Sequence, residues 1–395
     1  MRRALVLGLA RSGRAAQAAL EAGGIEVVAA DRKLGNDEDP SLLDNVDVVV
    51  KSPGVPGEAT LVAAARARGV PVWSEIELAS RLLPNPILGV TGTNGKTTTT
   101  ELLGAMLGAR TAGNVGTALS ELVGDVPANE WVVCELSSFQ LEDIEGFRPR
   151  IAVLLNLEPD HLDRHGSFDA YRAAKLRIFE NQSGEDVAVV PRGFGPVPGG
   201  ARRIEFSAGD ALPAEPLIPG PHNRENAAAA TAAARAAGLD EDAIAQALRT
   251  FPGVAHRLEL VAEIAGVRYV NDSKATNTAA ARRALASFDA PLRLILGGSL
   301  KGERFDEFAD AVAAADVASA YLIGEAAEPL AAALGYANVP FLLATTLERA
   351  VTEAASAARP GDVILLSPAC ASYDQFTDFE HRGKEFRRLV ENLEG

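Results

Sequence analysis

The chain has little cysteine, few aromatic residues and no excess of basic charge. Its two cysteines, Cys134 and Cys370, both lie in apolar stretches and provide no disulfide framework. Aromatic residues make up 5% of the chain and hydrophobic residues 47%, a composition typical of an alanine-rich α/β protein. Lys and Arg number 38 against 53 Asp and Glu, and the resulting net charge of −15 disfavours nucleic acid as a partner.

Long apolar runs are also absent. No apolar run is long enough to span a membrane, and the N-terminus lacks the apolar core and the cleavage site of a signal peptide. We therefore expect a cytoplasmic protein without a membrane partner. Its 395 residues suffice for two or three domains, each with its own core.

A glycine-rich segment is the most informative feature of the sequence. Residues 89–98 read Gly-Val-Thr-Gly-Thr-Asn-Gly-Lys-Thr-Thr, and they lie between a short apolar strand and a helical pattern at 102–107. In such a loop, backbone N–H groups bind phosphate oxygens and the helix N-terminus adds positive partial charge. Lys96 would reach the β- and γ-phosphates of a nucleotide, and Thr97 would hold Mg²⁺. The strict motif has glycine where Val90 stands, so the match is imperfect.

The N-terminal residues have the pattern of a strand–helix–strand unit with a dinucleotide-type turn. A strand at 4–9 leads into the turn at 8–13, a helix follows, and a second strand ends at Asp31. The central glycine of the G-x-G-x-x-G pattern is replaced by Ala10, which weakens the dinucleotide interpretation. Asp31 lies where such sites place the acid that binds a ribose. Two interpretations stay open, namely a nucleotide or nucleotide-sugar site and a doubly wound domain that binds no nucleotide.

Polar residues follow the next two expected strands. A strand at 131–134 ends in Glu135, and the following strand leads to Asp160 and His161. Because the carboxyl ends of parallel strands line the ligand crevice, we expect these side chains to converge. An acid at this point is typical of the metal-directed carboxylate in a nucleotide-binding sheet. Lys175, by contrast, has the pattern of an ordinary surface lysine on a helix.

The last third of the chain repeats this arrangement in a second expected parallel sheet. Three of its expected strands end in polar or glycine-rich clusters, at 267–270, 292–296 and 363–366. Such clusters could be ordinary loop and cap residues. Their repetition at one end of a sheet favours a ligand site.

These patterns predict an α/β protein with three domains. We expect a Rossmann-like domain at 1–84, a phosphate-loop ATPase domain with a mainly parallel sheet at 85–253, and a Rossmann-like domain at 254–395. Within the middle domain, residues 182–215 are rich in glycine and proline and offer one short strand, at 187–190. A helix is expected at 227–237, directly after Asn226.

Several motifs resemble those of the Mur ligase family, which comprises ATP-dependent enzymes that extend the cytoplasmic peptidoglycan precursor. Residues 91–98 resemble the phosphate loop of that family, which departs from the generic motif as this one does. Residues 135–142, 271–277 and 367–372 resemble the members that add D-glutamate. The resemblance covers nearly the whole chain and is weakest in the N-terminal region, where two basic residues follow Asp31.

The resemblance implies a ligase that joins D-glutamate to UDP-N-acetylmuramoyl-L-alanine, with ATP and two Mg²⁺ sites, and we expect a monomer. The implied catalytic residues are Lys96, Glu135, His161 and Lys175; the implied metal ligands are Thr97, Glu135, His161 and Lys175, the lysine being carboxylated by CO₂ in that family. The implied ATP contacts are Gly92, Thr93, Asn94, Gly95, Lys96, Thr97, Thr98, Asn226, Arg257, Asp272 and Lys274. The implied D-glutamate contacts are Thr276, Lys301, Ser372 and Phe379. The implied UDP-sugar contacts are Asp31, Ser52, Gly54, Asn114, Ser137 and Gln140.

Three other classes stay open. A folylpolyglutamate-type ligase shares the phosphate loop and the chemistry but lacks an N-terminal nucleotide-type region and the stretch at 369–372. A phosphate-loop NTPase switch would hydrolyse ATP without two further substrates. A dinucleotide-dependent oxidoreductase is disfavoured by Ala10 and by the better phosphate loop downstream. Dependence of ATP hydrolysis on both a UDP-muramyl acid and an amino acid would separate these classes.

Overall fold

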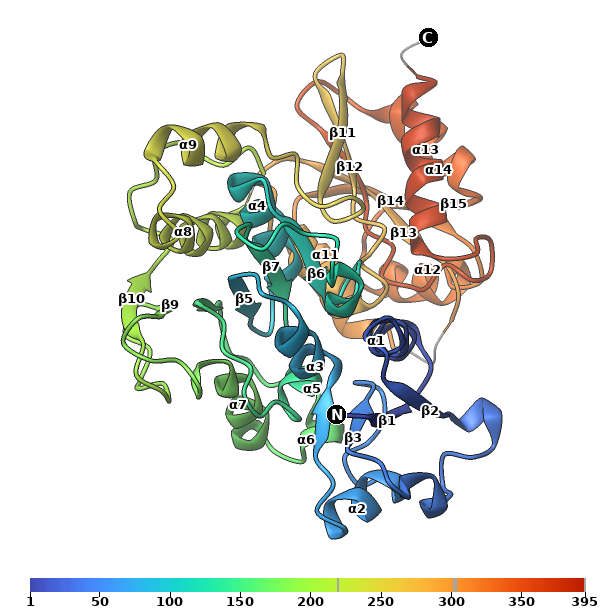
Figure 1. The fold of residues 1–395 in the computed structure, drawn as a ribbon. Coiled ribbons are helices and arrows are strands. Elements are labelled where there is room, and N and C mark those ends of the chain that lie inside the picture. Colours follow the sequence, from blue (N-terminus) through green and yellow to red (C-terminus); the bar gives the residue numbers. More distant parts are fainter. Residues whose placement is uncertain (219, 301–303, 394–395) are drawn as a thin grey trace. The chain divides into compact units, whose positions relative to one another are not determined.

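The computed structural model describes residues 1–218, 220–300 and 304–393. It is an α/β protein with three sheets, and Figure 1 follows their elements along the chain. Within the described residues, no helix is long and apolar enough to cross a membrane.

The chain forms two compact units. One consists of Met1–Glu215 and Glu225–Arg249 and contains the first two sheets. The other consists of Pro216–Arg224 and Thr250–Gly395 and contains the third sheet.

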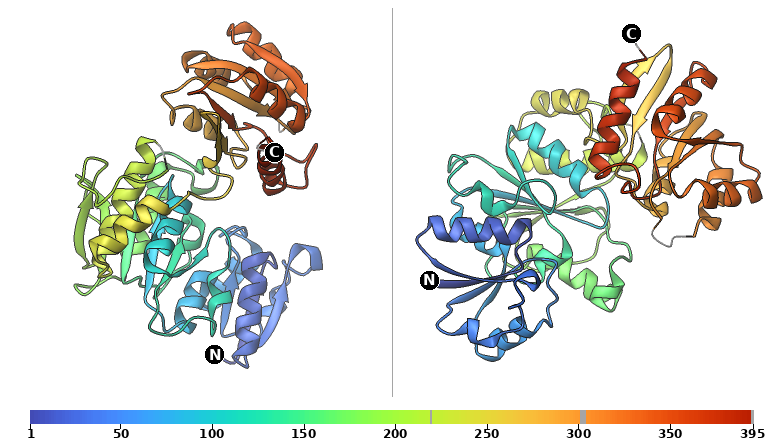
Figure 2. Two further views of the ribbon diagram at one scale, coloured as in Figure 1. Left: turned by 90° about the horizontal axis from the view of Figure 1, so that it is seen from above. Right: turned by 90° about the vertical axis from the view of Figure 1, so that its right-hand side faces the viewer.

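The first sheet has four parallel strands in the order β2-β1-β3-β4. Its elements are β1 (Arg3–Leu7), α1 (Arg11–Ala22), β2 (Glu26–Ala30), β3 (Val48–Lys51), α2 (Thr60–Ala67), β4 (Val72–Ser74) and α3 (Glu75–Leu82). Neighbouring residues of a strand point to opposite faces, so Leu5 packs in one cluster with Leu61 of α2, and Val6 in another with Leu20 of α1. Helices α1 and α2 therefore cover opposite faces of this sheet (Figure 2).

The second sheet has six parallel strands in the order β10-β9-β8-β5-β7-β6. Its first elements are β5 (Ile87–Thr91), α4 (Lys96–Leu107), β6 (Arg110–Gly113), β7 (Val132–Glu135), α5 (Ser138–Leu141) and β8 (Ile151–Leu154). They are followed by α6 (Leu162–His165), α7 (Phe168–Leu176), β9 (Val187–Pro191), β10 (Arg202–Phe206), α8 (Pro221–Ala236) and α9 (Glu241–Thr250). The central strand β5 lies between β7 and β8, so the turn after β5 is flanked by the ends of both neighbours.

Three expectations for this region are wrong. The helix after the glycine-rich segment begins at Lys96 rather than at residue 102, because the threonines of its first turns are buried and extend its packed face. Residues 182–215 contain a second strand, β10, which lies at the edge of the sheet and therefore lacks an apolar pattern. Helix α8 begins at Pro221 rather than at residue 227, and proline is well suited to a first helical turn.

The third sheet has the order β11-β12-β16-β13-β14-β15, and only β11 runs antiparallel to its neighbour. Its elements are β11 (Glu259–Ile264), β12 (Val267–Asn271), α10 (Thr278–Leu285), β13 (Leu292–Gly297), α11 (Asp306–Ala314), β14 (Val317–Ile323), α12 (Ala327–Tyr336), β15 (Phe341–Thr345), α13 (Leu347–Ala357), β16 (Val363–Leu366) and α14 (Phe379–Glu391). Leu294 packs in one core cluster with Phe308 of α11, and Ile295 in another with Phe386 of α14. Helices thus cover both faces of the sheet. Because β12, β16 and β13 are parallel neighbours, their polar carboxyl ends lie at the same edge.

Helix α3 joins the two cores of the first unit. Leu78 belongs to the core of the first sheet, whereas Ile76 and Ala79 belong to the core of the second. The two sheets therefore share a helix that is apolar on two sides.

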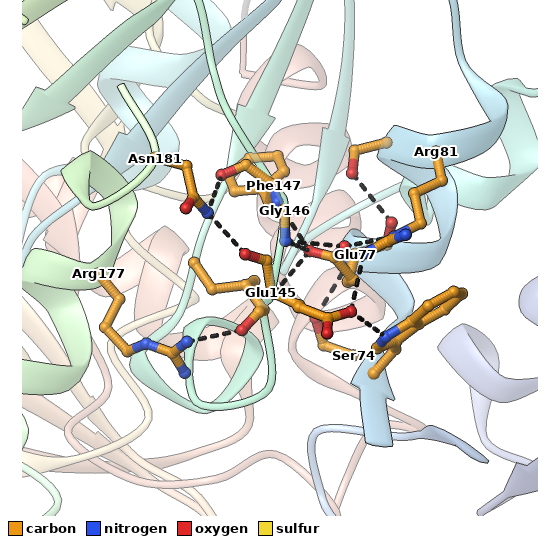
Figure 3. Close-up of polar contacts among 11 residues, drawn as sticks. Ser74, Glu77, Arg81, Glu145, Gly146, Phe147, Arg177 and Asn181 are labelled. Atoms are coloured by element: carbon orange, nitrogen blue, oxygen red, sulfur yellow. Dashed lines mark hydrogen bonds and ion pairs between the residues drawn. The ribbon is translucent and has the colours of Figure 1, made fainter. Parts of the chain in front are cut away.

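Glu77 is fully buried in this shared helix. Its carboxylate accepts hydrogen bonds from the backbone N–H groups of Glu145, Gly146 and Phe147 at 2.8–3.0 Å and from Arg81 Nε at 2.5 Å (Figure 3). Burial alone would raise the pKa of Glu77, but these donors outweigh burial and lower it. The charged carboxylate thus fixes the loop at 145–147 to α3.

Candidate active site

The glycine-rich segment forms the turn between β5 and α4. Gly92 and Gly95 have φ values of 155° and 82°, conformations that favour glycine. A Cβ atom on Gly95 would clash with the side-chain amide of Asn226, which comes from α8. The structure thus brings Asn226, which the resemblance implies as an ATP contact, against the phosphate loop.

The loop is held by the segment that follows β8. The backbone N–H of Asn94 donates to Asn156 Oδ1 at 2.9 Å, and Asn94 Nδ2 donates to Glu158 Oε2 at 2.8 Å. Thr93 Oγ1 lies 3.0 Å from the hydroxyl of Tyr171 and accepts the backbone N–H of Glu158 at 3.0 Å. The sequence patterns predict no role for Asn156, Glu158 or Tyr171, although Asn156 stands at a strand end.

Two lysines converge on one carbonyl of the loop. Lys96 Nζ donates to the carbonyls of Gly92 and Thr93 at 3.0 and 2.9 Å, and Lys175 Nζ donates to the Gly92 carbonyl at 2.8 Å. The interpretation of Lys175 as a surface lysine is wrong, because it is 2% exposed. Burial, followed by the charge of Lys96, lowers the pKa of Lys175 to about 7. A large fraction of this amine is therefore neutral near neutral pH.

Glu135 lies at the end of β7, beside the loop. It is 2% exposed, and its Oε1 accepts a hydrogen bond from Asn114 Nδ2 at 3.0 Å. Its Oε2 is buried and has no hydrogen-bond partner in the described part of the chain. An unpartnered buried carboxylate oxygen is costly, and a hard cation would satisfy it. The hydroxyl of Thr97, buried in the first turn of α4, is a second oxygen donor of the type that Mg²⁺ prefers.

His161 and Lys175 both contact Tyr171. The rings of His161 and Tyr171 are 6.4 Å apart, and Lys175 Nζ lies 4.9 Å from the centre of the Tyr171 ring. His161 also packs at 4.9 Å on the ring of Phe139, and its Nε2 lies 3.6 Å from Asp160 Oδ2. Across residues 1–218, 220–300 and 304–393, however, no three His, Cys, Asp or Glu side chains are grouped to hold a metal. A metal near His161 would therefore need at least one ligand other than a His, Cys, Asp or Glu side chain.

The expected UDP-sugar residues of the first sheet support its first turn. Asp31 accepts the backbone N–H groups of Leu9 and Lys33 at 2.6 and 2.8 Å, and these bonds lower the pKa of Asp31. Ser52 Oγ donates to the Gly8 carbonyl at 2.6 Å. Strand ends of β2 and β3 therefore fix the β1–α1 turn from two sides.

The other expected UDP-sugar residues lie in three segments, which follow β3, β6 and β7. Gly54 is exposed in the turn after β3, and Asn114 contacts Glu135. Ser137 and Gln140 cap α5, because Ser137 N donates to Gln140 Oε1 at 2.9 Å and Gln140 N donates to Ser137 Oγ at 3.3 Å. These two side chains thus have a local structural role, whatever else they bind.

In the second unit, the expected ATP and D-glutamate residues gather at the strand ends. Asp272 accepts a hydrogen bond from Ser367 Oγ at 2.8 Å, and burial raises the pKa of Asp272 to about 7. Lys274 Nζ lies 5.6 Å from the centre of the Phe379 ring. Ser372 is buried. The remaining expected residues are Arg257 and Thr276 in this unit, and Lys301, which lies outside the described residues.

Arg382 is a residue of this region that the sequence did not single out. It is 1% exposed in α14, and it donates to the carbonyls of Ser273, Gly297, Cys370 and Ala371 at 2.9–3.3 Å. Burial lowers the pKa of Arg382 to about 10. One guanidinium thus ties together the segments that follow β12, β13 and β16.

Three features define a protein that binds nucleoside polyphosphates. They are the glycine-rich turn before α4, the buried Lys175 that donates to its Gly92 carbonyl, and the unpartnered carboxylate oxygen of Glu135 at the neighbouring strand end. The family models for the Mur ligase middle domain and for the Mur ligase glutamate ligase domain match residues 90–193 and 256–370. The chain belongs to the Mur ligase family.

Relatives in this family match the chain over nearly its whole length. The UDP-N-acetylmuramoylalanine–D-glutamate ligases of Acidobacterium capsulatum and Anaeromyxobacter dehalogenans are 40% and 43% identical to it, over 98% of this chain and 96% and 97% of theirs. Among solved structures, UDP-N-acetylmuramate-alanine ligase from Thermotoga maritima is similar in fold, with a TM-score of 0.58 at 21% identity over 100% of this chain and 99% of its own. The MurF ligase of Thermotoga maritima, solved in complex with ADP, has a TM-score of 0.58 at 19% identity and coverages of 91% and 92%.

Proposed function

We propose that the chain is an ATP-dependent ligase that joins D-glutamate to UDP-N-acetylmuramoyl-L-alanine during synthesis of the peptidoglycan precursor. The observation that carries the proposal is the phosphate loop with Lys96, Lys175 and the unpartnered oxygen of Glu135 beside it. The relatives that match over nearly the whole chain carry the name of this activity.

The proposed reaction needs no covalent enzyme nucleophile. A carboxylate is a poor electrophile, so the carboxylate of the UDP-sugar substrate first takes the γ-phosphoryl group of ATP and becomes an acyl phosphate. The neutral amine of D-glutamate then attacks the acyl carbon, and phosphate leaves. Lys96 and the loop N–H groups bind and orient the phosphates in both steps. Gly92, Thr93, Asn94, Gly95, Thr98, Asn226, Arg257, Asp272 and Lys274 are the further proposed ATP contacts.

Thr97 and Glu135 are the residues proposed to hold Mg²⁺ beside the phosphates. The unpartnered oxygen of Glu135 supports this assignment. A second proposed site consists of His161 and Lys175 carboxylated by CO₂, and the lowered pKa of Lys175 supports it because only the neutral amine reacts with CO₂. Bound Mg²⁺ would neutralise phosphate charge in the transition state.

The remaining roles are proposed by region. D-glutamate would contact Thr276, Lys301, Ser372 and Phe379, and the UDP-sugar would contact Asp31, Ser52, Gly54, Asn114, Ser137 and Gln140. We further infer a monomer in the cytoplasm with three domains at 1–84, 85–253 and 254–395. The three separate sheets support that division.

A phosphate-release assay tests the proposed function. Purified protein with ATP and Mg²⁺ should release phosphate only when both UDP-N-acetylmuramoyl-L-alanine and D-glutamate are present. L-glutamate should be a poor acceptor, because binding both carboxylates of D-glutamate fixes the direction of its amine. Charge-assisted hydrogen bonds of about 1.5–3 kcal/mol each would supply that selectivity. Release with ATP alone would instead favour an NTPase switch, and a preference for the L-isomer would overturn the substrate assignment.

A folded Lys96→Ala variant tests in the same assay whether the loop is the ATP site. It should lose the substrate-dependent release, while its circular dichroism spectrum matches that of the wild type. Near-normal turnover in this variant would contradict the assignment of the loop as the ATP site.

A further inference from the structure

Two ion pairs link the segment that follows α5 to the end of β3 and to α6. Lys51 Nζ lies 3.0 Å from Asp143 Oδ2, and Arg164 Nη2 lies 2.8 Å from Glu142 Oε2. The exposed fractions of these side chains are 1% for Lys51, 5% for Asp143, 17% for Arg164 and 23% for Glu142. Glu142 and Asp143, which are adjacent in the segment after α5, thus bind two cations that come from β3 and α6.

Both cations donate to the same backbone oxygen. The carbonyl of Val55 accepts Lys51 Nζ at 3.0 Å and Arg164 Nη2 at 3.2 Å. Val55 closes the turn after β3, because its N–H donates to the Ser52 carbonyl at 3.0 Å. The guanidinium of Arg164 also lies 4.6 Å from the centre of the Phe139 ring, on which His161 packs. The Ser52–Val55 turn, α5 and the His161 segment are therefore linked through one carbonyl.

We propose that Lys51 and Arg164 are positioning residues for the UDP-sugar substrate. They fix the turn that carries Ser52 and Gly54 at a set distance from α5, which carries Ser137 and Gln140. This inference rests on the proposed function, which places the UDP-sugar on both elements. Neither cation needs to touch the substrate, because each acts through the Val55 carbonyl.

The low exposure of both ion pairs explains why they can hold the turn in place. A surface ion pair contributes little and tolerates many geometries, whereas a buried pair persists only if charges and hydrogen bonds match. Lys51 pairs its charge with Asp143 and donates its hydrogen bond to the Val55 carbonyl, whereas Arg164 donates to both Glu142 and that carbonyl and also packs on the Phe139 ring. A shift of the turn would leave these groups without partners, so the spacing is held firmly.

Steady-state kinetics of full-length Arg164→Met and Lys51→Met test the proposal. We expect KM for UDP-N-acetylmuramoyl-L-alanine to rise by about tenfold in each, with KM for ATP within about twofold of wild type, since only one substrate spans the displaced turn. Arg164→Lys, which retains a cation, should recover part of the increase. The combined Lys51→Met/Arg164→Met variant should be little worse than the poorer single variant, because both residues act on one carbonyl.

Arg66→Met is the matched control. Arg66 Nη2 donates to the other oxygen of Asp143 at 2.9 Å, and its Nη1 donates at 2.8 Å to the carbonyl of Gly57, which lies beyond the Ser52–Val55 turn. Because Arg66 does not donate to the Val55 carbonyl, its loss should leave all three KM values near wild type. If Lys51→Met does not fold, Arg164→Met still decides the question, because its side chain is less buried.

Three results would overturn the positioning role. They are an unchanged KM for the UDP-sugar in folded Arg164→Met, an equal rise in all three KM values, and a loss of thermal stability without a change in KM. A wild-type protein that does not turn over the UDP-sugar would overturn the proposed function itself, and with it this role. The two failures are thus distinguished by the wild-type assay.

Discussion

Replacing Lys175 by methionine should make the protein more stable while abolishing its activity. The amine is buried beside a second cation, Lys96, and its pKa is lowered from 10.5 to about 7. At pH 7 the unfolded state is protonated, so folding must release a proton or bury a charge. Linkage puts that cost at about 4 kcal/mol. Methionine avoids the cost and loses one hydrogen bond to Gly92 of about 1 kcal/mol, so the net gain in unfolding free energy should be about 3 kcal/mol.

The lowered pKa of Lys175 also predicts how the stability difference between the two proteins changes with pH. A folded-state pKa below the unfolded value means that the unfolded state binds more protons between pH 7 and 10.5, so wild-type stability rises with pH across that window. The cost of the buried amine should fall to about 2 kcal/mol at pH 9. The advantage of Lys175→Met should therefore shrink by about 2 kcal/mol between pH 7 and pH 9.

Urea unfolding of both proteins at these two pH values measures the effect. The buffers must be purged of CO₂, because carboxylation would replace the amine by an anion. Lys33→Met is the control, since Lys33 is an exposed lysine of the same unit and its loss should give no comparable gain. A Lys175→Met protein that is less stable than wild type at pH 7, or a stability difference that grows with pH, would refute the reasoning.

Three further substitutions test the rest of the site. Glu135→Gln should lower product formation by about a hundredfold or more in the phosphate-release assay, with no loss of melting temperature in calorimetry, because the acid serves a ligand and not the fold. Gly95→Ala should lower the unfolding free energy by about 1–2 kcal/mol and weaken ATP binding in calorimetric titration, because the φ of 82° and the amide of Asn226 both oppose a side chain. Adding Asn226→Gly should recover part of the unfolding free energy, because it removes the clashing amide, but not the ATP affinity, because it also removes a proposed ATP contact. Arg382→Met should cost about 3–5 kcal/mol in urea unfolding, because it removes a donor from four buried carbonyl oxygens, of which that of Ala371 keeps the N–H of Ser299. Arg382→Lys should restore only part of this loss.

The phosphate loop and the strand-end acids could be predicted because their signals are local. A glycine pattern, a following lysine and an apolar strand that ends in Glu135 are all readable within a few residues of sequence. The same holds for the α/β fold class, which follows from the alternation of short apolar strands with helical patterns. The edge strand β10 could not be found in this way, because exposure to solvent removes the apolar alternation.

The buried charges could not be predicted because their partners are distant in sequence. Nothing in the local sequence marks Glu77 or Arg382 as buried. The loop at 145–147 supplies the hydrogen-bond donors of Glu77, and the segments at three strand ends supply the acceptors of Arg382. The local pattern around Lys175 predicts a surface lysine for the same reason, since its acceptor, the carbonyl of Gly92, is distant in sequence. Periodicity describes one helix in isolation. An ionisable side chain is buried only where other parts of the fold supply its hydrogen-bond or charge partners.

The position of Lys175 beside Lys96 at the Gly92 carbonyl connects its cost to stability with its proposed function. Two like charges near one oxygen repel each other, and the charge of Lys96 contributes to the lowered pKa of Lys175. The lowered pKa leaves Lys175 partly neutral, which is the form that CO₂ can carboxylate. Carboxylation would replace a second cation by an anion beside Lys96, so repulsion would become attraction and an oxygen donor would face the His161 side. The instability of the unmodified lysine and its proposed role as a metal ligand therefore have the same physical origin.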